Sequence, residues 1–387
     1  MSKFLSFIAL WALVSMSVAN RAWASEWPQS IYSYGSSFLS SDKMTQVNGV
    51  IGFKTDGYNN SSDQSLGTGL LLDGILKYRL TQEITTIVDA AVVADTGYSQ
   101  VTYVDDYQPS NNVLINEISL GWSPIELLNL KIGALNQAVY DDPIFLSNIP
   151  FPEATQTLTL AQGNLNLEFS SGEAVPSSST SSPVTTQTNG LPALFLERIK
   201  FGIDDHKNLS ASVWGSYFNF VNLPAQVAQE SRLRGNTVTG VGVQGAQFAY
   251  GFSGLESGLS FRYKVPHSHL TPVFNANFID NFDSPDQTDQ AYLLSSGVEI
   301  RVSDGLFLTP KAEYFYLQSD ASPAYYNVTW YGHNNFEGPS GSLLLDWRRE
   351  KICLEGRFSS GQVITANPIQ NNFTLFYLAV SKTYDFL

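Results

Sequence analysis

Few residues of this chain have the types and spacing that catalysis or metal binding requires. The four histidines are His206, His267, His269 and His333, and none lies in a recognisable catalytic motif. His267 and His269 could present two imidazoles on one face of a strand, but a zinc site needs three or four ligands. The neighbouring acids are not at a diagnostic spacing. A solvated turn is the simpler interpretation, and we expect no metal, no cofactor and no catalytic residue.

Two further motifs are equally weak as signs of chemistry. Gly240 to Gly245 matches the pattern G-x-G-x-x-G, but a dinucleotide site needs these glycines between a strand and the start of a helix. Here they lie in an alternating segment, where glycine more often marks a bend or a close approach. Cys353 is the single cysteine, so it forms no intramolecular disulfide. Its alternation with Ile352 and Leu354 predicts that it points inward.

Charged side chains recur at alternate positions of strand-like segments, with apolar residues between them. In a membrane barrel the apolar face contacts lipid and the polar face lines the lumen. This phase predicts the pore-lining residues Glu117, Lys131, Arg198, Lys200, Arg262, Lys264, Glu299, Arg301, Lys311, Glu313, Asp346, Arg348, Glu355 and Arg357. It also places Asp73, Lys77, Arg79, Asp89 and Glu168 inside and Lys54 near a rim. Glu197 breaks the pattern, which leaves the phase at the start of its segment open.

The predicted wall is basic although the chain is acidic, with a net charge of -14. The phase argument places 12 basic and 8 acidic residues inside, a net charge of +4. Because charges in water are screened within about 8 Å at physiological salt, a basic lining predicts a mild anion preference. Neighbouring segments also pair acids with bases across the wall. Such pairs can act as ion-pair ladders, as a transverse field at a constriction, or as both.

Segment 138–153 mixes acids with apolar residues and prolines. Its acids are Asp141, Asp142 and Glu153. This composition suits a loop folded against a wall, where it would narrow a pore. An ordinary external loop explains the segment equally well.

The elements that would position these residues are strands. Hydrophobic residues make up 43% of the chain. Charged residues make up only 14%, whereas they make up roughly 25% of a typical soluble domain. No segment after residue 24 is apolar for long enough to span a membrane as a helix. Alternation predicts seventeen strand-like segments: 29–40, 45–56, 67–80, 83–95, 111–123, 126–137, 154–170, 191–204, 208–221, 236–250, 256–265, 270–282, 290–303, 306–319, 340–349, 352–362 and 372–386.

Single-chain bacterial barrels have even strand numbers, so one segment is in excess, and the first segment or the region 236–282 is the expected place. We therefore predict an all-β fold: a transmembrane antiparallel up-and-down β-barrel of about 16 strands, within a range of 14–18. Short turns alternate with longer loops at 96–110, 138–153, 171–190, 222–235, 320–339 and 363–371. In such barrels the long loops face outward from the cell.

The two ends of the chain support export to an outer membrane. Lys3, an apolar run from Phe4 to Val18 and the sequence Ala22-Trp-Ala24 predict a signal peptide over 1–24 and a barrel over 25–387. At the other end, residues 372–387 alternate apolar and polar residues. This strand resembles the assembly signal of outer-membrane proteins, except that Phe386 is penultimate instead of last.

Two internal segments resemble porins. Residues 116–136 resemble a porin hairpin in which an inward acid precedes a Pro turn and a returning strand, and residues 270–281 echo it. With both ends, these make the chain similar to the broad superfamily of Gram-negative porins. The resemblance implies contact with outer-membrane lipid, passive diffusion of small hydrophilic solutes, and a homotrimer as one form of assembly.

Other function classes are weaker but stay open. A substrate-specific uptake receptor, for example for a chelated metal, is the main alternative, and an outer-membrane hydrolase is a weaker one. Without Lys3 and Arg21 of the signal peptide, 19 basic residues stand against 35 acidic ones. Nucleic acid is therefore not an expected partner, because binding it requires a basic face.

Overall fold

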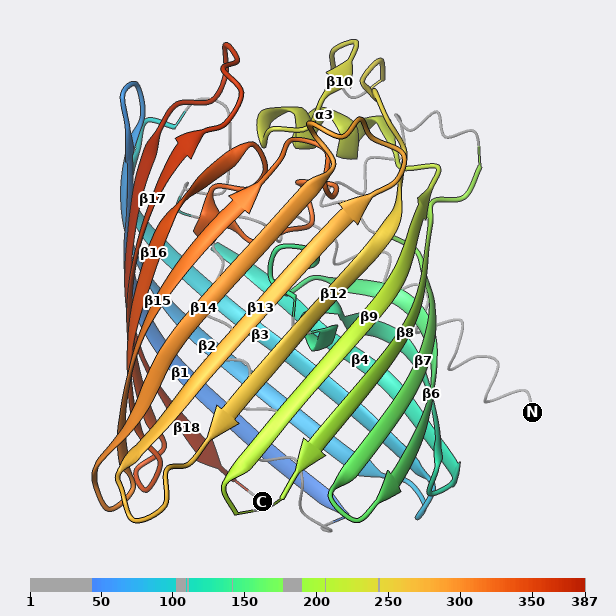
Figure 1. Ribbon diagram of the computed structural model, residues 1–387, viewed down its shortest axis with the longest axis vertical. Coiled ribbons are helices and arrows are strands. Elements are labelled where there is room, and N and C mark those ends of the chain that lie inside the picture. Colours follow the sequence, from blue (N-terminus) through green and yellow to red (C-terminus); the bar gives the residue numbers. More distant parts are fainter. Residues whose placement is uncertain are drawn as a thin grey trace.

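A closed barrel of sixteen antiparallel strands forms the fold (Figure 1). The computed structural model describes residues 44–101, 109, 111–140, 142–176, 190–205, 207–242 and 244–386. The first strand, β1, pairs with β2 on one side and with β18 on the other, which closes the wall. The predicted barrel and its strand number are confirmed. The predicted signal peptide, 1–24, lies outside the described residues.

The wall strands follow one another in chain order around the barrel. Their bounds are β1 (Thr45–Asn60), β2 (Gln64–Arg79), β3 (Ile84–Ser99), β4 (Asn111–Ile125), β5 (Leu128–Asn136), β6 (Pro150–Gln162), β7 (Leu165–Ala174), β8 (Ala193–Asp204), β9 (Leu209–Val221), β12 (Phe252–Tyr263), β13 (Leu270–Asn281), β14 (Gln290–Ser303), β15 (Leu306–Leu317), β16 (Phe336–Trp347), β17 (Ile352–Val363) and β18 (Phe373–Asp385).

Two of the predicted strand segments are wrong, and their errors offset one another. Segment 154–170 contains a turn at Gly163, whose φ of 60° suits a residue without Cβ, so it belongs to two strands, β6 and β7. Segment 236–250 is not part of the wall. It forms the small hairpin of β10 (Val238–Thr239) and β11 (Gln247–Phe248), which follows helix α3 (Ala225–Leu233). Segment 29–40 lies outside the described residues.

The two ends of the barrel differ in the length of their connections. Short turns such as 163–164, 304–305 and 348–351 lie at the lower end in Figure 1, and the longer loops and α3 lie at the upper end. We call these the short-turn end and the long-loop end. Among the described residues, no helix has the length and apolar character needed to cross a membrane.

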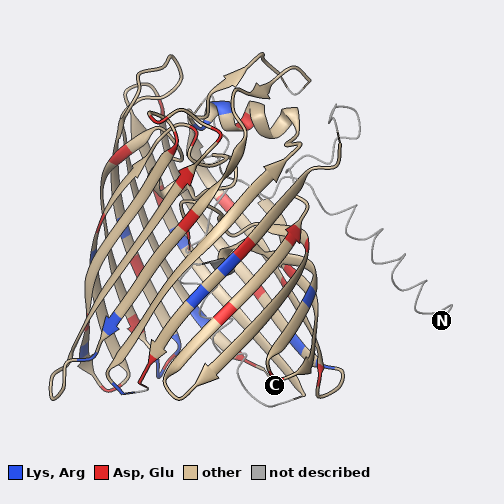
Figure 2. Ribbon diagram, turned by 45° about the vertical axis from the view of Figure 1, so that its right-hand side comes forward, with Lys and Arg blue, Asp and Glu red and all other residues tan. Residues whose placement is uncertain are grey.

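Alternation along the strands separates an apolar outer face from an inner face. Figure 2 shows single charged residues spaced along the wall strands, with uncharged residues between them. On β2, Leu70 and Leu72 are exposed on the outside, whereas Leu71 and Asp73, which alternate with them, are buried on the inside. Glu197 is exposed on the outer face of β8, between the inward residues Leu196 and Arg198. The phase of this strand is therefore regular, and Glu197 is an outward acid.

The hydrophobic core lies inside the barrel, toward the long-loop end. It combines inward residues of the wall, such as Phe151, Phe218 and Phe315, with residues of two loops, such as Phe145 and Tyr326. The lumen is therefore filled with apolar residues toward the long-loop end and is polar toward the short-turn end, and the candidate site lies in this lumen.

Candidate functional site

The loop between β15 and β16, residues 318–335, fills the interior of the barrel at the long-loop end. Residues 320–335 are all buried, including Tyr325, Tyr326 and Tyr331 at no more than 2% exposure. Tyr326 stacks on Phe220 of β9 with ring centroids 6.0 Å apart, and Trp330 meets Tyr377 of β18 at 4.7 Å. The loop thus contacts opposite parts of the wall. The expectation that 320–339 is an external loop is wrong, and we call residues 318–335 the plug loop.

A second inward loop follows β5 and runs through the short helix η3 (Gln137–Tyr140) to β6. Ile144, Phe145 and Leu146 are each 1% exposed, and Phe145 packs on Phe218 of β9 at 4.8 Å between ring centroids. The predicted loop against the wall is present at residues 142–149, which we call the constriction loop. Asp141 lies outside the described residues.

Direct hydrogen bonds join the two loops. The backbone N–H of Ser147 donates to the carbonyl of Tyr326 at 2.7 Å, and that of Val328 donates to the carbonyl of Pro143 at 3.2 Å. Because the backbone polar groups of both loops find partners in each other, their burial in an apolar lumen is feasible. The two loops therefore form one partition across the barrel.

Polar side chains tie the plug loop to the long-loop end. Asp320 accepts hydrogen bonds from the backbone and hydroxyl of Thr237 at 2.8 and 2.7 Å. The Asn236 side chain donates to the carbonyls of Ser319 and Ser322 at 2.5 and 2.9 Å and accepts from the backbone of Ala324 at 2.7 Å. The segment after α3 thus holds the plug loop in place.

On the wall, three of the predicted pore-lining residues clamp the plug loop. Arg357 lies 3.3 Å from Glu313 and 3.6 Å from Glu355. Arg357 also donates to the hydroxyl of Tyr331, which in turn donates to Glu313. The guanidinium lies 5.7 Å from the centroid of Trp330. These charged side chains face inward as predicted, but they contact one another and the plug loop instead of an open pore.

A buried pair of acids anchors the constriction loop. The carboxylate of Glu256, on β12, accepts hydrogen bonds from Trp214 at 2.5 Å and from Ser216 at 2.6 Å. Burial, and then the carboxylate of Glu256 beside it, raise the pKa of Asp142 well above its usual range, although Arg198 acts in the opposite direction. The raised pKa favours the protonated form of Asp142, which can donate to Glu256. Glu153, the third acid of the segment, is buried and accepts from Gln137.

Below the partition, toward the short-turn end, the lumen holds a cavity of about 590 Å³. We call it the vestibule. Its charged lining consists of five basic residues and two acidic ones: Lys207, Arg262, Lys264, Arg301 and Arg348 against Asp204 and Glu299. His269 and Phe307 also line it. The vestibule therefore offers a small solute an excess of positive charge.

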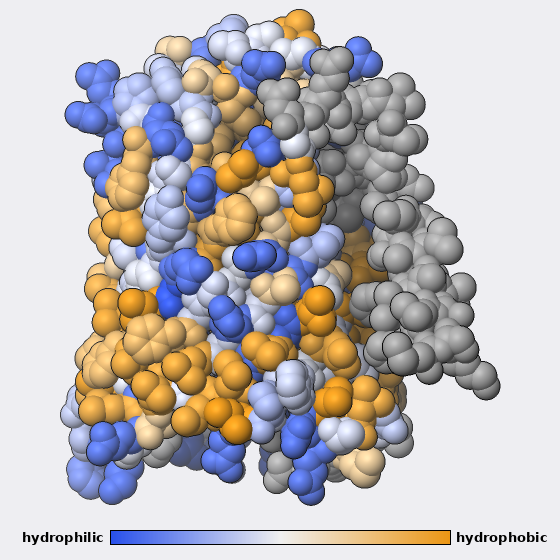
Figure 3. Space-filling view, turned by 90° about the vertical axis from the view of Figure 1, so that its right-hand side faces the viewer, coloured by the Kyte–Doolittle hydropathy of each residue, from blue (hydrophilic) through white to orange (hydrophobic). Residues whose placement is uncertain are grey.

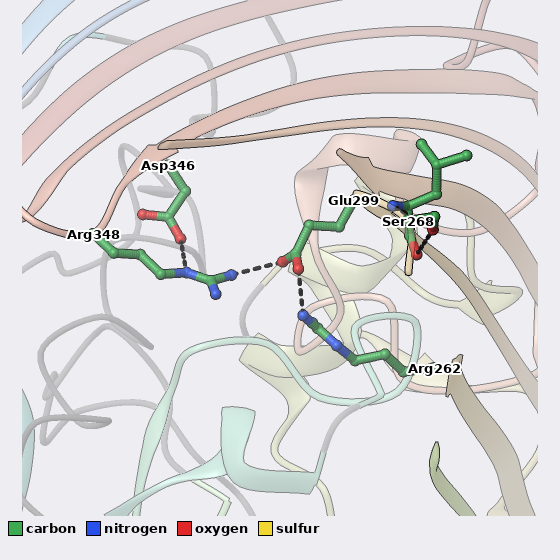
Figure 4. Close-up of polar contacts among 6 residues, drawn as sticks. Arg262, Ser268, Glu299, Asp346 and Arg348 are labelled. Carbon is green, nitrogen blue, oxygen red and sulfur yellow. Dashed lines mark hydrogen bonds and ion pairs between the residues drawn. The ribbon is translucent and has the colours of Figure 1, made fainter. Parts of the chain in front are cut away.

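Glu299 organises the basic residues of the vestibule (Figure 4). It accepts from Arg262 at 2.5 Å and from Arg348 at 2.6 Å, so that one carboxylate holds guanidinium groups from β12 and from the turn after β16. Arg348 also donates to Asp346 at 2.8 Å and lies 3.8 Å from the ring centroid of Phe307. Both arginines stay nearly half exposed, which leaves donors that can meet a solute.

The other predicted pore-lining residues lie around the same inner face. Lys131 pairs with Glu117 at 2.6 Å on the wall formed by β4 and β5. Arg198 and Lys200 lie 5.2 and 5.7 Å from the ring centroid of Trp214. Lys311 occupies an inward position of β15. The fourteen predicted residues thus lie in or beside the vestibule, in the clamp on the plug loop, and at other inward positions of β4, β5, β8 and β15.

Sequence reasoning missed two parts of this site. Glu256 was the first residue of a predicted strand, and the same alternation that places Arg262 inside would have placed it inside. The expected exterior position of the plug loop overlooks Tyr325, Tyr326, Trp330 and Tyr331, which form an aromatic group that is unusual for an exposed loop. That composition was the available signal.

The remaining glycine, histidine and cysteine residues singled out in the sequence lie in turns, in the plug loop or in the wall. Gly240 and Gly242 have φ values of 71° and 78° in the hairpin between β10 and β11, so they lie in a turn and not inside a strand as expected. His267 lies in the turn between β12 and β13, and His333 contacts Asn327 at 2.8 Å within the plug loop. Cys353 is buried on the inner face. Within the described ranges, no group of three His, Cys, Asp or Glu side chains could hold a metal ion.

Solved structures share this architecture. A high-pH structure of Pseudomonas putida OprB matches with a TM-score of 0.54 and 9% identity over 88% of this chain and 94% of that chain. A loop-deletion mutant of OmpT, an outer membrane protein of Vibrio cholerae, matches with a TM-score of 0.51 and 10% identity over 88% of this chain and 100% of that chain.

Salmonella typhi OmpF in complex with daunomycin has a TM-score of 0.50 and 9% identity over 88% of this chain and 97% of that chain. No protein-family model matches the sequence, and no curated protein sequence matches it. The shared feature is the fold, which is that of outer-membrane porins.

Proposed function

We propose that the chain is an outer-membrane channel for small hydrophilic solutes, closed in this conformation by the plug loop and the constriction loop. The observation that carries the proposal is a closed barrel with an apolar outer face and a polar vestibule inside. A sixteen-strand wall is wide enough to enclose an aqueous channel. Transport would be passive, with no chemistry on the solute.

The vestibule supports a mild preference for anions. Its lining carries five basic side chains against two acidic ones, and fixed charges that a solute must pass at short range act more strongly than screened charges in distant loops. Selectivity in channels comes from such wall charges and from the pore width. The solutes that fit this lining best are small anions.

A substrate-specific uptake receptor is the second candidate, and the partition favours it. Under this proposal the two hydrogen-bonded loops block the lumen, so that solutes pass only when a loop moves. In a receptor, binding of a particular solute would supply the free energy for that movement, because a ligand shifts an equilibrium only by its differential affinity for the two states. In a diffusion channel, the loops would open spontaneously.

Planar-bilayer recordings separate these candidates. The wild-type protein is compared with a variant in which residues 320–334 are replaced by a short Gly-Ser linker, and with a control in which the exposed residues 285–287 are replaced in the same way. We expect brief openings in the wild type and long-lived conduction in the plug-loop variant only. A wild type that never conducts without a particular solute would favour the receptor.

Cell fractionation and gel mobility test the location. We expect the mature protein in outer membranes, with a mobility on gels that changes on boiling, since detergent rarely opens a closed barrel in the cold. Recovery as a soluble periplasmic protein would overturn the proposal. We also propose that the protein is not an enzyme. Hydrolysis of lipid or peptide by the purified barrel would contradict this proposal.

A further inference from the structure

The vestibule combines its basic residues with neutral side chains that form hydrogen bonds. Its lining includes four such residues: Asn208, Ser210, Ser268 and Thr271. The turn between β8 and β9 is fixed because Asp205 accepts hydrogen bonds from the backbone N–H groups of Lys207 and Asn208 at 2.9 and 2.6 Å. Charged and neutral hydrogen-bonding groups thus line one cavity at fixed positions.

The vestibule reaches the short-turn end. Its lining includes Lys207 and Asn208 of the turn between β8 and β9, and His269 of the turn between β12 and β13. Among the described residues that line it, none belongs to the plug loop or the constriction loop. Hydrophilic residues gather at this end of the molecule, below apolar residues of the outer wall (Figure 3). Entry of a polar solute from this end therefore requires neither loop to move.

The arginines carry more N–H groups than their acidic partners use. A guanidinium group has five N–H donors. The contacts to Glu299 and Asp346 use one nitrogen of Arg262 and two of Arg348. The side chains of Arg262, Arg348 and Arg301 are 46%, 45% and 48% exposed. Several charged donors are therefore accessible to a solute in the vestibule.

These donors are held in place before a solute binds. Glu299 binds Arg262 with one carboxylate oxygen and Arg348 with the other (Figure 4). The guanidinium of Arg348 also lies 3.8 Å from the ring centroid of Phe307. Because less side-chain freedom is lost on binding, groups held in this way bind a ligand at a lower cost in entropy.

We propose that the vestibule binds a phosphate monoester of a small hydroxylated solute. This assignment rests on the proposed function, for which it names the class of solute. A phosphate monoester has a charge of about -1.5 to -2 at pH 7 and three strong acceptor oxygens. Arginine suits phosphate because its planar donors match the oxygens in pairs. A carboxylate has one charge and two oxygens, so it satisfies fewer of the donors.

The neutral side chains suit the remainder of such a solute. The cavity of about 590 Å³ is larger than a phosphate group alone requires. The hydroxyls of Ser210 and Thr271 can each donate and accept a hydrogen bond, as the hydroxyls of a sugar can. A sugar phosphate therefore matches the vestibule in charge, in size and in hydrogen bonding.

Isothermal titration calorimetry on the folded wild-type protein in detergent, at low salt, tests this site. The probes are glucose 6-phosphate, inorganic phosphate, gluconate and glucose. We expect glucose 6-phosphate to bind most tightly and inorganic phosphate more weakly. Gluconate should bind about tenfold or more weakly than glucose 6-phosphate, because a charge-assisted hydrogen bond is lost. Glucose should show no measurable binding. The closed barrel is sufficient, since entry requires neither loop to move.

Three kinds of variant separate the parts of the site. Arg348→Gln should weaken the binding of glucose 6-phosphate and of inorganic phosphate alike, by about tenfold, and Arg262→Gln is a second variant of this kind. Ser210→Ala should weaken glucose 6-phosphate severalfold and leave inorganic phosphate unchanged. Lys131→Gln is the charge-matched control, because Lys131 faces the lumen but pairs with Glu117 outside the vestibule. Its affinity for both probes should equal that of the wild type.

The outcomes distinguish the site from the channel. Equal affinities for gluconate and glucose 6-phosphate would show a general basic lining and overturn the phosphate site. If glucose 6-phosphate does not bind to a protein that conducts in planar bilayers, the site is wrong and the proposed channel stands. If it binds as expected to a protein that never conducts, even with residues 320–334 replaced, the site stands and the channel is wrong.

Discussion

The hydroxyl of Tyr331, in the plug loop, donates a hydrogen bond of 3.3 Å to Glu313 on the inner face of β15. The same hydroxyl accepts from Arg357 of β17 at 3.1 Å. One loop side chain is thus held by charged groups of two wall strands. Because the loop crosses the lumen, the free energy of this contact bears directly on whether the barrel is closed.

Tyr331→Phe should increase the time that the channel spends open. A hydrogen bond to a charged group contributes about 1.5–3 kcal/mol, so its loss should raise the ratio of open to closed states roughly tenfold or more. Single-channel recording measures that ratio. Tyr314→Phe is the matched control, because its hydroxyl bonds Glu337 on the outer face. Equal open fractions for Tyr331→Phe and the wild type would show that the clamp does not hold the plug loop.

The constriction loop should loosen as the pH rises. The pKa of Asp142 is raised by burial and by Glu256, so the folded loop favours the protonated acid. Its contribution to docking is therefore complete at low pH and is lost as the pH rises through the raised pKa, above the usual range of an aspartate. Conductance should increase over that range. Asp142→Asn, whose amide can still donate to Glu256, should abolish the increase, whereas Asp283→Asn at the exposed long-loop end should retain it.

Replacing Arg262 and Lys264 together by Gln should lower the ratio of anion to cation permeability. At about 10 Å in water each charge changes the energy of a passing monovalent ion by about 0.4 kcal/mol, so the ratio should fall severalfold at low salt. Reversal potentials under a salt gradient measure it. Lys382→Gln, on the outer face of β18, should leave the ratio unchanged. A wild-type channel that already prefers cations at low salt would contradict the anion preference.

Glu299→Gln should change selectivity in the opposite direction. It removes the carboxylate that holds both Arg262 and Arg348, while Asp346 still orients Arg348. Both guanidinium groups are nearly half exposed, so water can solvate them and the barrel should stay folded. The anion preference should rise, again by reversal potential. If selectivity is the same in Glu299→Gln and the wild type, ions do not pass through the vestibule.

The faces of the wall strands could be predicted because a strand has a period of two residues. In β16 and β17, Leu345 and Leu354 alternate with charged neighbours, and one face must meet lipid. The same local rule explains the errors. It predicts one strand across the turn at Gly163, where the chain forms two. It also assigns a wall strand to 236–250, because alternation alone does not show whether a segment pairs with the wall.

The sequence by itself determined the barrel class and the inward position of residues such as Arg262 and Glu313, since these follow from local periodicity and from the need to close every edge in lipid. The strand count was right only because two errors in the segments offset one another. Only the tertiary structure decided that the plug loop lies inside. Its Tyr326 packs against Phe151 and Phe220 on distant strands. Burial of apolar surface depends on which residues contact one another across the lumen. These contacts join residues that are far apart in the sequence, so local patterns do not reveal them.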